Sequence, residues 1–410
     1  MLRNTASLAW RCLGCASQYY PPIWVKVMQS WSPQHYRFHG TTENVPESIL
    51  ESAISRIELI RARNPNITPV LTLRHLSLLA DVDYVFLRRV ASRSTHPYRA
   101  FMLKKNVPGR TRLRLICVPN KNLKKIQDWI VRNILRHTRA HRKSFAYHPY
   151  SRPEFAAQAH CDCDYLLKVD IEDFFHRVSE GRVYKIFCDL GYSELVSLEL
   201  ARITTTVAEG TERPIESIHF RWPAIPAYVS PYEGFLPQGA PTSPMLSNLA
   251  MLGLDEQLDS MAREEGIVYT RYADDLTFSA RRPHNAATIK RFKRRVLALL
   301  NDTGFRPNHR KTMIRGPGAR RIVLGMLVDG PKPRLPNEFK DEIRKHLYYL
   351  QSEKFGPAHH SAANKVSIST LYHIVRGLIG WAARVEPEYG RRCLQQFKLI
   401  EWPPIDRGSS

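Results

Sequence analysis

Two adjacent acidic residues inside a β-rich segment constrain this chain more than any other feature. Residues 267–272 and 276–280 are rich in β-branched and aromatic side chains, and Ala273, Asp274 and Asp275 separate the two runs. This spacing predicts a β-hairpin. Carboxylates held this close together raise each other's pKa unless a cation lies nearby. The pair therefore indicates a cation site, and an ordinary Asp-containing turn is the alternative that the hairpin alone leaves open.

A third carboxylate follows a second predicted strand. Residues 165–170 read as a short strand that ends at Asp170, and a helix is predicted from Phe174. Asp170 could cap that helix, but Glu172 or Asp173 could do so equally well, which leaves Asp170 for a metal. Nucleotidyl transfer uses two Mg²⁺ ions roughly 3.5–4 Å apart, bound by oxygen ligands. Three carboxylates at strand ends are the residue types that such a site needs.

The charge of the chain favours a polyanionic partner. Its 410 residues contain 61 Lys and Arg against 38 Asp and Glu, a formal charge of +23. A surplus of this size is typical of proteins that bind nucleic acid. No run approaches the roughly 20 apolar residues of a membrane span. The seven cysteines are irregularly spaced, so neither a disulfide framework nor a four-ligand zinc site is expected.

A Gly/Pro-rich loop lies between the two acidic segments. Residues 236–244 read Leu-Pro-Gln-Gly-Ala-Pro-Thr-Ser-Pro and precede an apolar helix, and such a loop lets backbone approach a ligand closely. Together, Asp170 with Phe174 and Phe175, this loop, and Tyr-Ala-Asp-Asp at 272–275 resemble the palm motifs of reverse transcriptases in order and spacing. The resemblance implies an α+β right-hand polymerase fold with fingers, a palm built on an antiparallel sheet and a helical thumb. It also implies an RNA-directed DNA polymerase.

The resemblance assigns the metal site to the three aspartates. Asp170, Asp274 and Asp275 match the family's catalytic carboxylates, and the Ile171 carbonyl matches an extra metal ligand. Together they would hold two Mg²⁺ ions, for which Mn²⁺ could substitute.

Four further residues match the family's nucleotide site. Phe175 lies where an aromatic ring excludes the ribose 2′-hydroxyl, Gln238 matches a glutamine that lines the site, and Lys311 matches a lysine near the leaving pyrophosphate. Arg114 matches the arginine that binds the triphosphate, a task suited to its planar fork, and Arg112 is the alternative. Phe175 could instead be a core phenylalanine, and Lys311 a solvated lysine.

The same resemblance divides the chain into three parts. Residues 1–45 are expected to be a basic, poorly ordered N-terminal extension, with a transit peptide as one alternative. Residues 46–330 would form the fingers and palm, and residues 331–410 the helical thumb. Basic residues of the thumb would bind the phosphates of a template–primer duplex: Arg334, Lys340, Arg344 and Lys345.

Within the family, the bacterial retron type is the most similar. Two of its marker motifs occur in altered form, as Ala-Ala-Gln-Ala-His at 156–160 and Val-Leu-Gly at 323–325, and in the family these help to recognise the cognate RNA. A retron-type enzyme would copy a structured non-coding RNA into a branched RNA–DNA product from deoxynucleoside triphosphates. It would act in anti-phage defence in the bacterial cytoplasm, and any effector protein would be a separate chain. The alternatives are a group II intron-like or orphan defence reverse transcriptase, or an inactive RNA-binding scaffold.

Overall fold

A computed structural model describes residues 31–107, 110–149, 151–207, 213–214, 228 and 232–404. The expected N-terminal extension lies outside the described residues up to residue 30. The turn at residues 108–109 and most of the segment 208–231 lie outside them as well. Within the described part, no helix is long and apolar enough to cross a bilayer.

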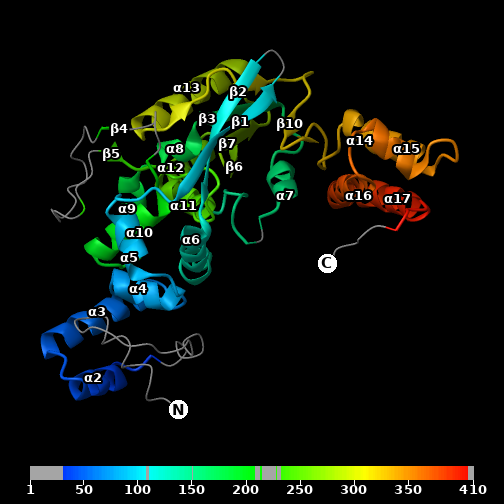
Figure 1. Ribbon diagram of the computed structural model, residues 1–410. Helices are drawn as coiled ribbons and strands as arrows, with labels where there is room; N and C mark the ends of the chain where they lie inside the picture. Colours follow the sequence, from blue (N-terminus) through cyan, green and yellow to red (C-terminus); the bar gives the residue numbers. More distant parts are fainter. Residues whose placement is uncertain are drawn as a thin grey trace.

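The N-terminal part is helical and leads into a long two-stranded ribbon. Its helices are α2 (Pro33–Thr42), α3 (Glu47–Arg63), α4 (Leu73–Ala80), α5 (Tyr84–Ala91) and α6 (Lys121–Asn133), and its strands are β1 (Tyr98–Val107) and β2 (Arg110–Pro119). The sequence over residues 98–118 predicts strands around a turn, and in the structure the two strands pair antiparallel from Tyr98 opposite Pro119. Figure 1 shows the ribbon running across the molecule.

An antiparallel sheet occupies the centre. Its strands are β3 (Tyr165–Glu172), β6 (Val268–Tyr272), β7 (Asp275–Ala280), β8 (Arg306–Pro307) and β9 (Met313–Arg315). The order is β6-β7-β3-β8, and β9 also pairs with β3. β3 is therefore the middle strand, and its burial on both faces explains why its sequence is almost wholly apolar up to Asp170.

Helices pack around this sheet, and all of them except α7 contribute to one large core. They are α7 (Pro153–Gln158), α8 (Phe174–Arg177), α9 (Glu180–Asp189), α10 (Glu194–Thr204), α11 (Ser243–Ala250), α12 (Leu252–Glu264) and α13 (Ala286–Asp302). Two short pairs of strands lie at the margins, β4 (Arg213–Pro214) with β5 (Tyr232–Glu233), and β10 (Ile322–Val323) with β11 (Met326–Leu327). The basic helix α13 buries Ile289, Phe292 and Val296 in this core.

The C-terminal helices form a group with its own core. They are α14 (Asn337–Gln351), α15 (Gly356–Ala363), α16 (Ile368–Val385) and α17 (Pro387–Lys398), and they stand beside the sheet in Figure 1. Trp381 and Val385 of α16 pack on a small core shared with β10 and β11. Arg384 adds an ion pair of 2.9 Å to Glu154 of α7. The C-terminal helical group (residues 337–398) is therefore joined to the rest through α16.

Three sequence expectations about the elements are wrong. Among the described residues, the helix α2 lies inside the expected extension, because Ser32 caps that helix and Tyr36 is buried against α3. The sequence over residues 73–90 favours a single helix, but the structure has two, since Asp81 has a φ of 51° and Asp83 caps a new helix through Phe86 N. The sequence over residues 322–328 favours one strand, but the structure has the β10–β11 hairpin there.

Candidate active site

The two acidic segments meet at the end of the central sheet. β6 and β7 form the predicted hairpin, in which Tyr272 pairs with Asp275, and Asp275 lies opposite Asp170 on β3. Asp274 occupies the turn, and its carbonyl accepts a 3.0 Å hydrogen bond from Ile171 N. The structure therefore brings together all four residues that the resemblance assigns to the metal site.

Electrostatics at this site reflect crowded negative charge. Burial and the charges of Asp170 and Asp275 raise the pKa of Asp274 above its usual value, and Lys311 opposes the shift. Lys311 Nζ lies 2.6 Å from Asp170 Oδ1, and Lys168 Nζ lies 3.8 Å from Asp275 Oδ2. Two lysines thus offset part of the charge of the cluster.

The donor set fits a hard divalent cation. Across the described residues, no group of three His, Cys, Asp or Glu side chains is already arranged as a metal site. Asp170, Asp274 and Asp275 nevertheless present only oxygen donors close together, and burial together with their mutual repulsion raises the pKa of Asp274. Carboxylates that repel one another in this way are suited to Mg²⁺, which takes oxygen ligands.

Asn308 is a contact that the sequence analysis missed. Its side-chain Nδ2 donates to Asp170 Oδ2 at 3.0 Å, and its backbone N donates to the Asp170 carbonyl at 2.7 Å. Asn308 therefore fixes both the strand end and the carboxylate of Asp170. Its position three residues before Lys311, which matches a family lysine, was the available signal.

A buried ion pair stabilises the β6–β7 hairpin. Arg271 is 0% exposed and binds Asp255 of α12 through two bonds, Nε to Oδ1 at 2.8 Å and Nη2 to Oδ2 at 2.6 Å. Its Nη1 also donates to the Ala273 carbonyl at 3.1 Å, and Ala273 has a φ of 57°. Arg271 thus stabilises the left-handed turn that presents Asp274.

His160 braces the same hairpin from a second side. Its ring is 0% exposed and lies 2.6 Å from Thr270 Oγ1 on β6 and 2.7 Å from Ser279 Oγ on β7. Burial and the charge of Lys143 lower the pKa of His160 to about 3, so the ring is neutral near pH 7. In the family the motif that residues 156–160 resemble helps to recognise RNA, whereas the His160 side chain of this chain is wholly buried and braces the hairpin.

The nucleotide-site residues lie on segments that adjoin one another. Arg114 is half-buried on β2, and the Gln238 carbonyl accepts a 2.8 Å hydrogen bond from Cys117 N on the same strand. Phe175 is half-buried in the first turn of α8. A hollow of about 360 Å³ lies between Phe175, the start of α6 and residues 239–244. The side chain of Arg112, the alternative to Arg114, lies outside the described residues.

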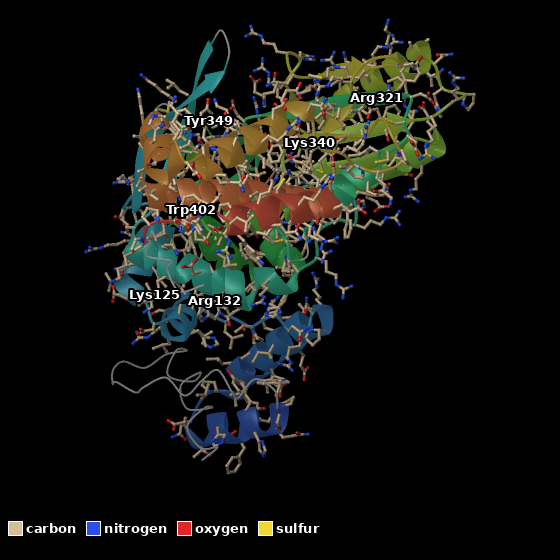
Figure 2. All side chains as sticks on the ribbon, turned by 90° about the vertical axis from the view of Figure 1, so that its right-hand side faces the viewer. Lys125, Arg132, Arg321, Lys340, Tyr349 and Trp402 are labelled. Atoms are coloured by element: carbon tan, nitrogen blue, oxygen red, sulfur yellow. The ribbon has the colours of Figure 1, made fainter. Side chains whose placement is uncertain are left out.

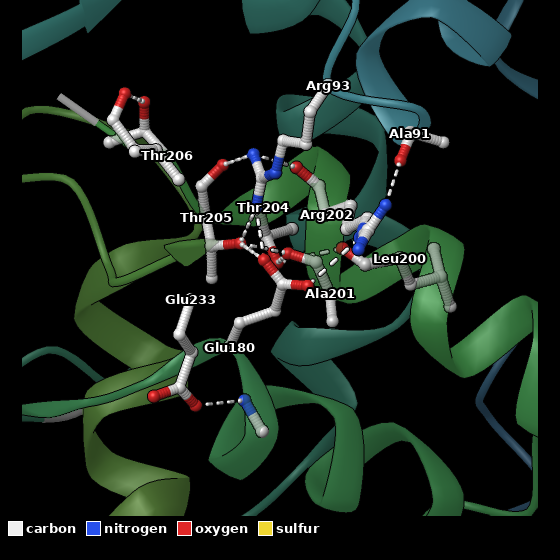
Figure 3. Close-up of polar contacts among 12 residues, drawn as sticks. Ala91, Arg93, Glu180, Leu200, Ala201, Arg202, Thr204, Thr205, Thr206 and Glu233 are labelled. Atoms are coloured by element: carbon white, nitrogen blue, oxygen red, sulfur yellow. Dashed lines mark hydrogen bonds and ion pairs between the residues drawn. The ribbon is translucent and has the colours of Figure 1, made fainter. Parts of the chain in front are cut away.

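A second buried ion-pair cluster secures the loop before Gln238 (Figure 3). Glu180, at the start of α9, binds Arg93 at 2.5 Å and Arg202 at 3.0 Å, and its side chain is 3% exposed. Burial favours a higher pKa for Glu180, but the two guanidinium groups lower it below its usual value. Glu180 N donates to the Gly234 carbonyl at 2.7 Å. The cluster thus ties α9, which follows the Phe175 helix, to the segment that leads into residues 236–244.

The basic residues expected to bind duplex phosphates lie on α14 or just before it. Arg334 pairs with Asp329 at 2.8 Å, Lys340 with Glu386 at 2.7 Å and Arg344 with Asp341. Lys345 is exposed on α14. Figure 2 shows Lys340 and Tyr349 on the face of the C-terminal helical group, with Lys125 and Arg132 on α6 below it. The arrangement leaves their role in binding nucleic acid a prediction.

Comparison with known proteins identifies the family. The reverse transcriptase (RNA-dependent DNA polymerase) family model matches residues 102–326, more than half of the chain. The chain is 28% identical over 345 residues to the retron Ec86 reverse transcriptase of Escherichia coli, covering 83% of this chain and 98% of that protein. It is 30% identical over 300 residues to the retron Mx162 reverse transcriptase of Myxococcus xanthus, covering 70% of this chain and 58% of that protein.

Among solved structures, a foamy viral protease–reverse transcriptase in complex with double-stranded DNA matches with a TM-score of 0.39 and 14% identity. That match covers 75% of this chain and 41% of the viral one. The range that the family model matches includes the central sheet from β3 to β9 and the β6–β7 hairpin described above. The chain therefore belongs to the reverse transcriptase family of RNA-directed DNA polymerases, and within it to the bacterial retron type.

Proposed function

We propose that this enzyme joins deoxynucleotides on a structured RNA template through a metal site formed by Asp170, Asp274 and Asp275. The observation that carries the proposal is the register of the sheet, which places Asp275 opposite Asp170 with Asp274 in the adjoining turn. Two Mg²⁺ ions held there, or Mn²⁺ in their place, would stabilise the attacking and leaving oxygens of the transfer. The Ile171 carbonyl is the fourth proposed ligand.

The chain's own groups would orient the nucleotide. Arg114 would bind the triphosphate through its planar fork, and Gln238 would line the site from the loop that adjoins β2. Phe175 would contact the sugar and exclude a 2′-hydroxyl. Lys311 would hold Asp170 in place and lie near the leaving pyrophosphate, because its ammonium group already lies 2.6 Å from that carboxylate.

The C-terminal helical group is proposed as the thumb, with fingers and palm in residues 46–330. Arg334, Lys340, Arg344 and Lys345 would contact phosphates of the RNA–DNA duplex, which proteins hold largely through its backbone and shape. Three of them already have acidic partners, so phosphates would have to replace those carboxylates. Substitution of Lys345 is therefore the most direct test among the four.

The metal-site assignment is tested by Asp274→Asn. The matched control is Asp302→Asn, an exposed carboxylate at the end of α13. Extension of a primer on an RNA template should be lost in Asp274→Asn and kept in the control, while both bind template–primer as the wild type does in fluorescence anisotropy. Normal extension by Asp274→Asn would refute the two-metal assignment.

We further propose the retron reaction, in which the enzyme makes a branched RNA–DNA product in the bacterial cytoplasm for anti-phage defence. The likeness to the Ec86 enzyme along 98% of its length supports this proposal. Purification of the protein with its bound nucleic acid, followed by sequencing of both strands, tests it. A DNA strand joined to a structured RNA is the expected result. DNA without such a joint would favour an intron-like or orphan enzyme, and RNA without DNA would favour a binding scaffold.

A further inference from the structure

Tyr147 lies at the candidate active site, although no motif singled it out. Its ring centroid is 6.1 Å from that of Phe175, and the two planes are inclined at 47°. Burial and the charge of Asp274 raise the pKa of the Tyr147 hydroxyl, and the charge of Arg114 opposes this shift. Tyr147 therefore stands among the residues proposed to bind the metal, the triphosphate and the sugar.

The backbone around Tyr147 is built to present this side chain. Phe145 N donates to the Arg271 carbonyl at 2.8 Å, so the preceding residues pair with β6. Asn248 of α11 donates to the Ala146 carbonyl at 2.7 Å. The next residue, Tyr147, has a φ of 66°, a left-handed conformation that a tyrosine adopts at an energetic cost. Strain of this kind persists only where the surrounding contacts impose it, and here they direct the ring to Phe175.

Phe175 is held on its inner side by a row of rings. Phe174 lies 5.6 Å from Phe175 and 6.0 Å from Phe305 between ring centroids, and Arg182 lies over the Phe305 ring at 4.6 Å. Phe174 and Phe305 are buried. Tyr147 is 40% exposed and extends this row at its open end. Loss of Tyr147 would remove this ring contact from the open side of Phe175.

We propose that Tyr147 is a positioning residue for sugar selection, which holds the Phe175 ring where the sugar of the incoming nucleotide binds. The inference rests on the proposed role of Phe175. A ring that can tilt away would leave room for a 2′-hydroxyl, so the loss of Tyr147 would relax the discrimination between deoxynucleotides and ribonucleotides. The hydroxyl is not required, because the contact is between rings.

The test measures kcat/KM for single incorporation of one deoxynucleotide and of its ribonucleotide on the same RNA template. Tyr147→Gly removes the ring and at the same time relieves the left-handed backbone, since glycine adopts a positive φ freely, so the fold should be kept. The preference for the deoxynucleotide should fall about tenfold, the upper end of what an aromatic pair contributes. Tyr147→Phe should retain the wild-type preference.

Two further variants separate the inference from the proposed function. Lys365→Gly is the backbone control, because Lys365 has a φ of 55° on the exposed surface between α15 and α16. It should leave the preference unchanged. Phe175→Ala tests the gate itself, and Tyr147→Gly added to it should lower the preference no further, because Tyr147 acts through Phe175.

The outcomes are distinguishable. An unchanged preference in Phe175→Ala would overturn the gate and the inference together. A lowered preference in Phe175→Ala with an unchanged one in Tyr147→Gly would overturn the inference alone. An equal loss of both nucleotides in Tyr147→Gly would do the same, because it would show a general defect in the site. An additive loss in the double variant would show that Tyr147 does not act through Phe175.

Discussion

Removal of the Glu180 charge should destabilise the enzyme more than any single change to its exposed ion pairs. Glu180→Gln keeps the shape of the side chain but leaves Arg93 and Arg202 without a counter-charge. The side chains of Arg93 and Arg202 are 10% and 3% exposed, so water cannot replace the carboxylate. Breaking a buried pair by removing one partner costs about 3–5 kcal/mol.

This loss is large on the scale of folding stability. A cost of about 3–5 kcal/mol is a substantial part of the roughly 5–15 kcal/mol that stabilises a typical protein. At about 2–4 °C per kcal/mol for a domain of this size, Tm should fall by about 6–20 °C. Thermal unfolding followed by circular dichroism measures the shift. The matched control is Glu338→Gln, whose ion pair with Arg320 is exposed, with side chains 68% and 55% accessible, and its Tm should stay close to that of the wild type.

The pH dependence gives a second measure of the same cluster. Because Arg93 and Arg202 lower the pKa of Glu180 below its ordinary value of 4.5, its contribution to stability is complete above pH 4.5 and is lost as the pH falls through the lower, folded-state pKa. Glu180→Gln should lack this component of acid sensitivity. If Glu180→Gln and Glu338→Gln shift Tm equally, the cluster does not stabilise the fold as a desolvated unit, and the reasoning is wrong.

Two further predictions concern stability. Burial lowers the pKa of His160 from 6.5 to about 3, so between these values only the unfolded chain takes up the proton, and the free energy of unfolding should fall by about 2 kcal/mol as the pH is lowered from 6.5 to 5. Urea titrations should show that the free energy of unfolding of His160→Gln depends less on pH. An unchanged pH dependence in this variant would contradict the assignment. Gly390 of α17 lies against the Ala383 backbone of α16, where an added Cβ would overlap main-chain atoms, so Gly390→Ala should cost about 1–3 kcal/mol. Gly377→Ala, where the Cβ meets nothing within 4 Å, should instead stabilise α16 by about 0.5–1 kcal/mol; equal Tm values for the two variants would show that the helices do not pack this closely.

The loop and hairpin signals in the sequence were reliable because they are local. Strands β6 and β7 follow from β-rich runs separated by a short turn, and the β1–β2 ribbon follows from the same kind of pattern. Helix breaks were harder to predict. The division between α4 and α5 depends on one left-handed aspartate, Asp81, whose conformation the apolar periodicity does not record.

The residue types in the sequence and their order were enough to identify the three aspartates and the family that they indicate. Only the tertiary structure decided how they are held. Asp170 and Asp275 are 105 positions apart in the sequence and lie opposite each other through the register of β3 and β7. Arg271 on β6 pairs with Asp255 on α12, and His160 contacts both β6 and β7. Tyr147 illustrates the limit, because neither its left-handed backbone nor its contact with Phe175 follows from neighbouring residues. A sequence determines which groups are available and which local turns present them, whereas desolvation and side-chain contacts depend on segments that only the folded chain brings together.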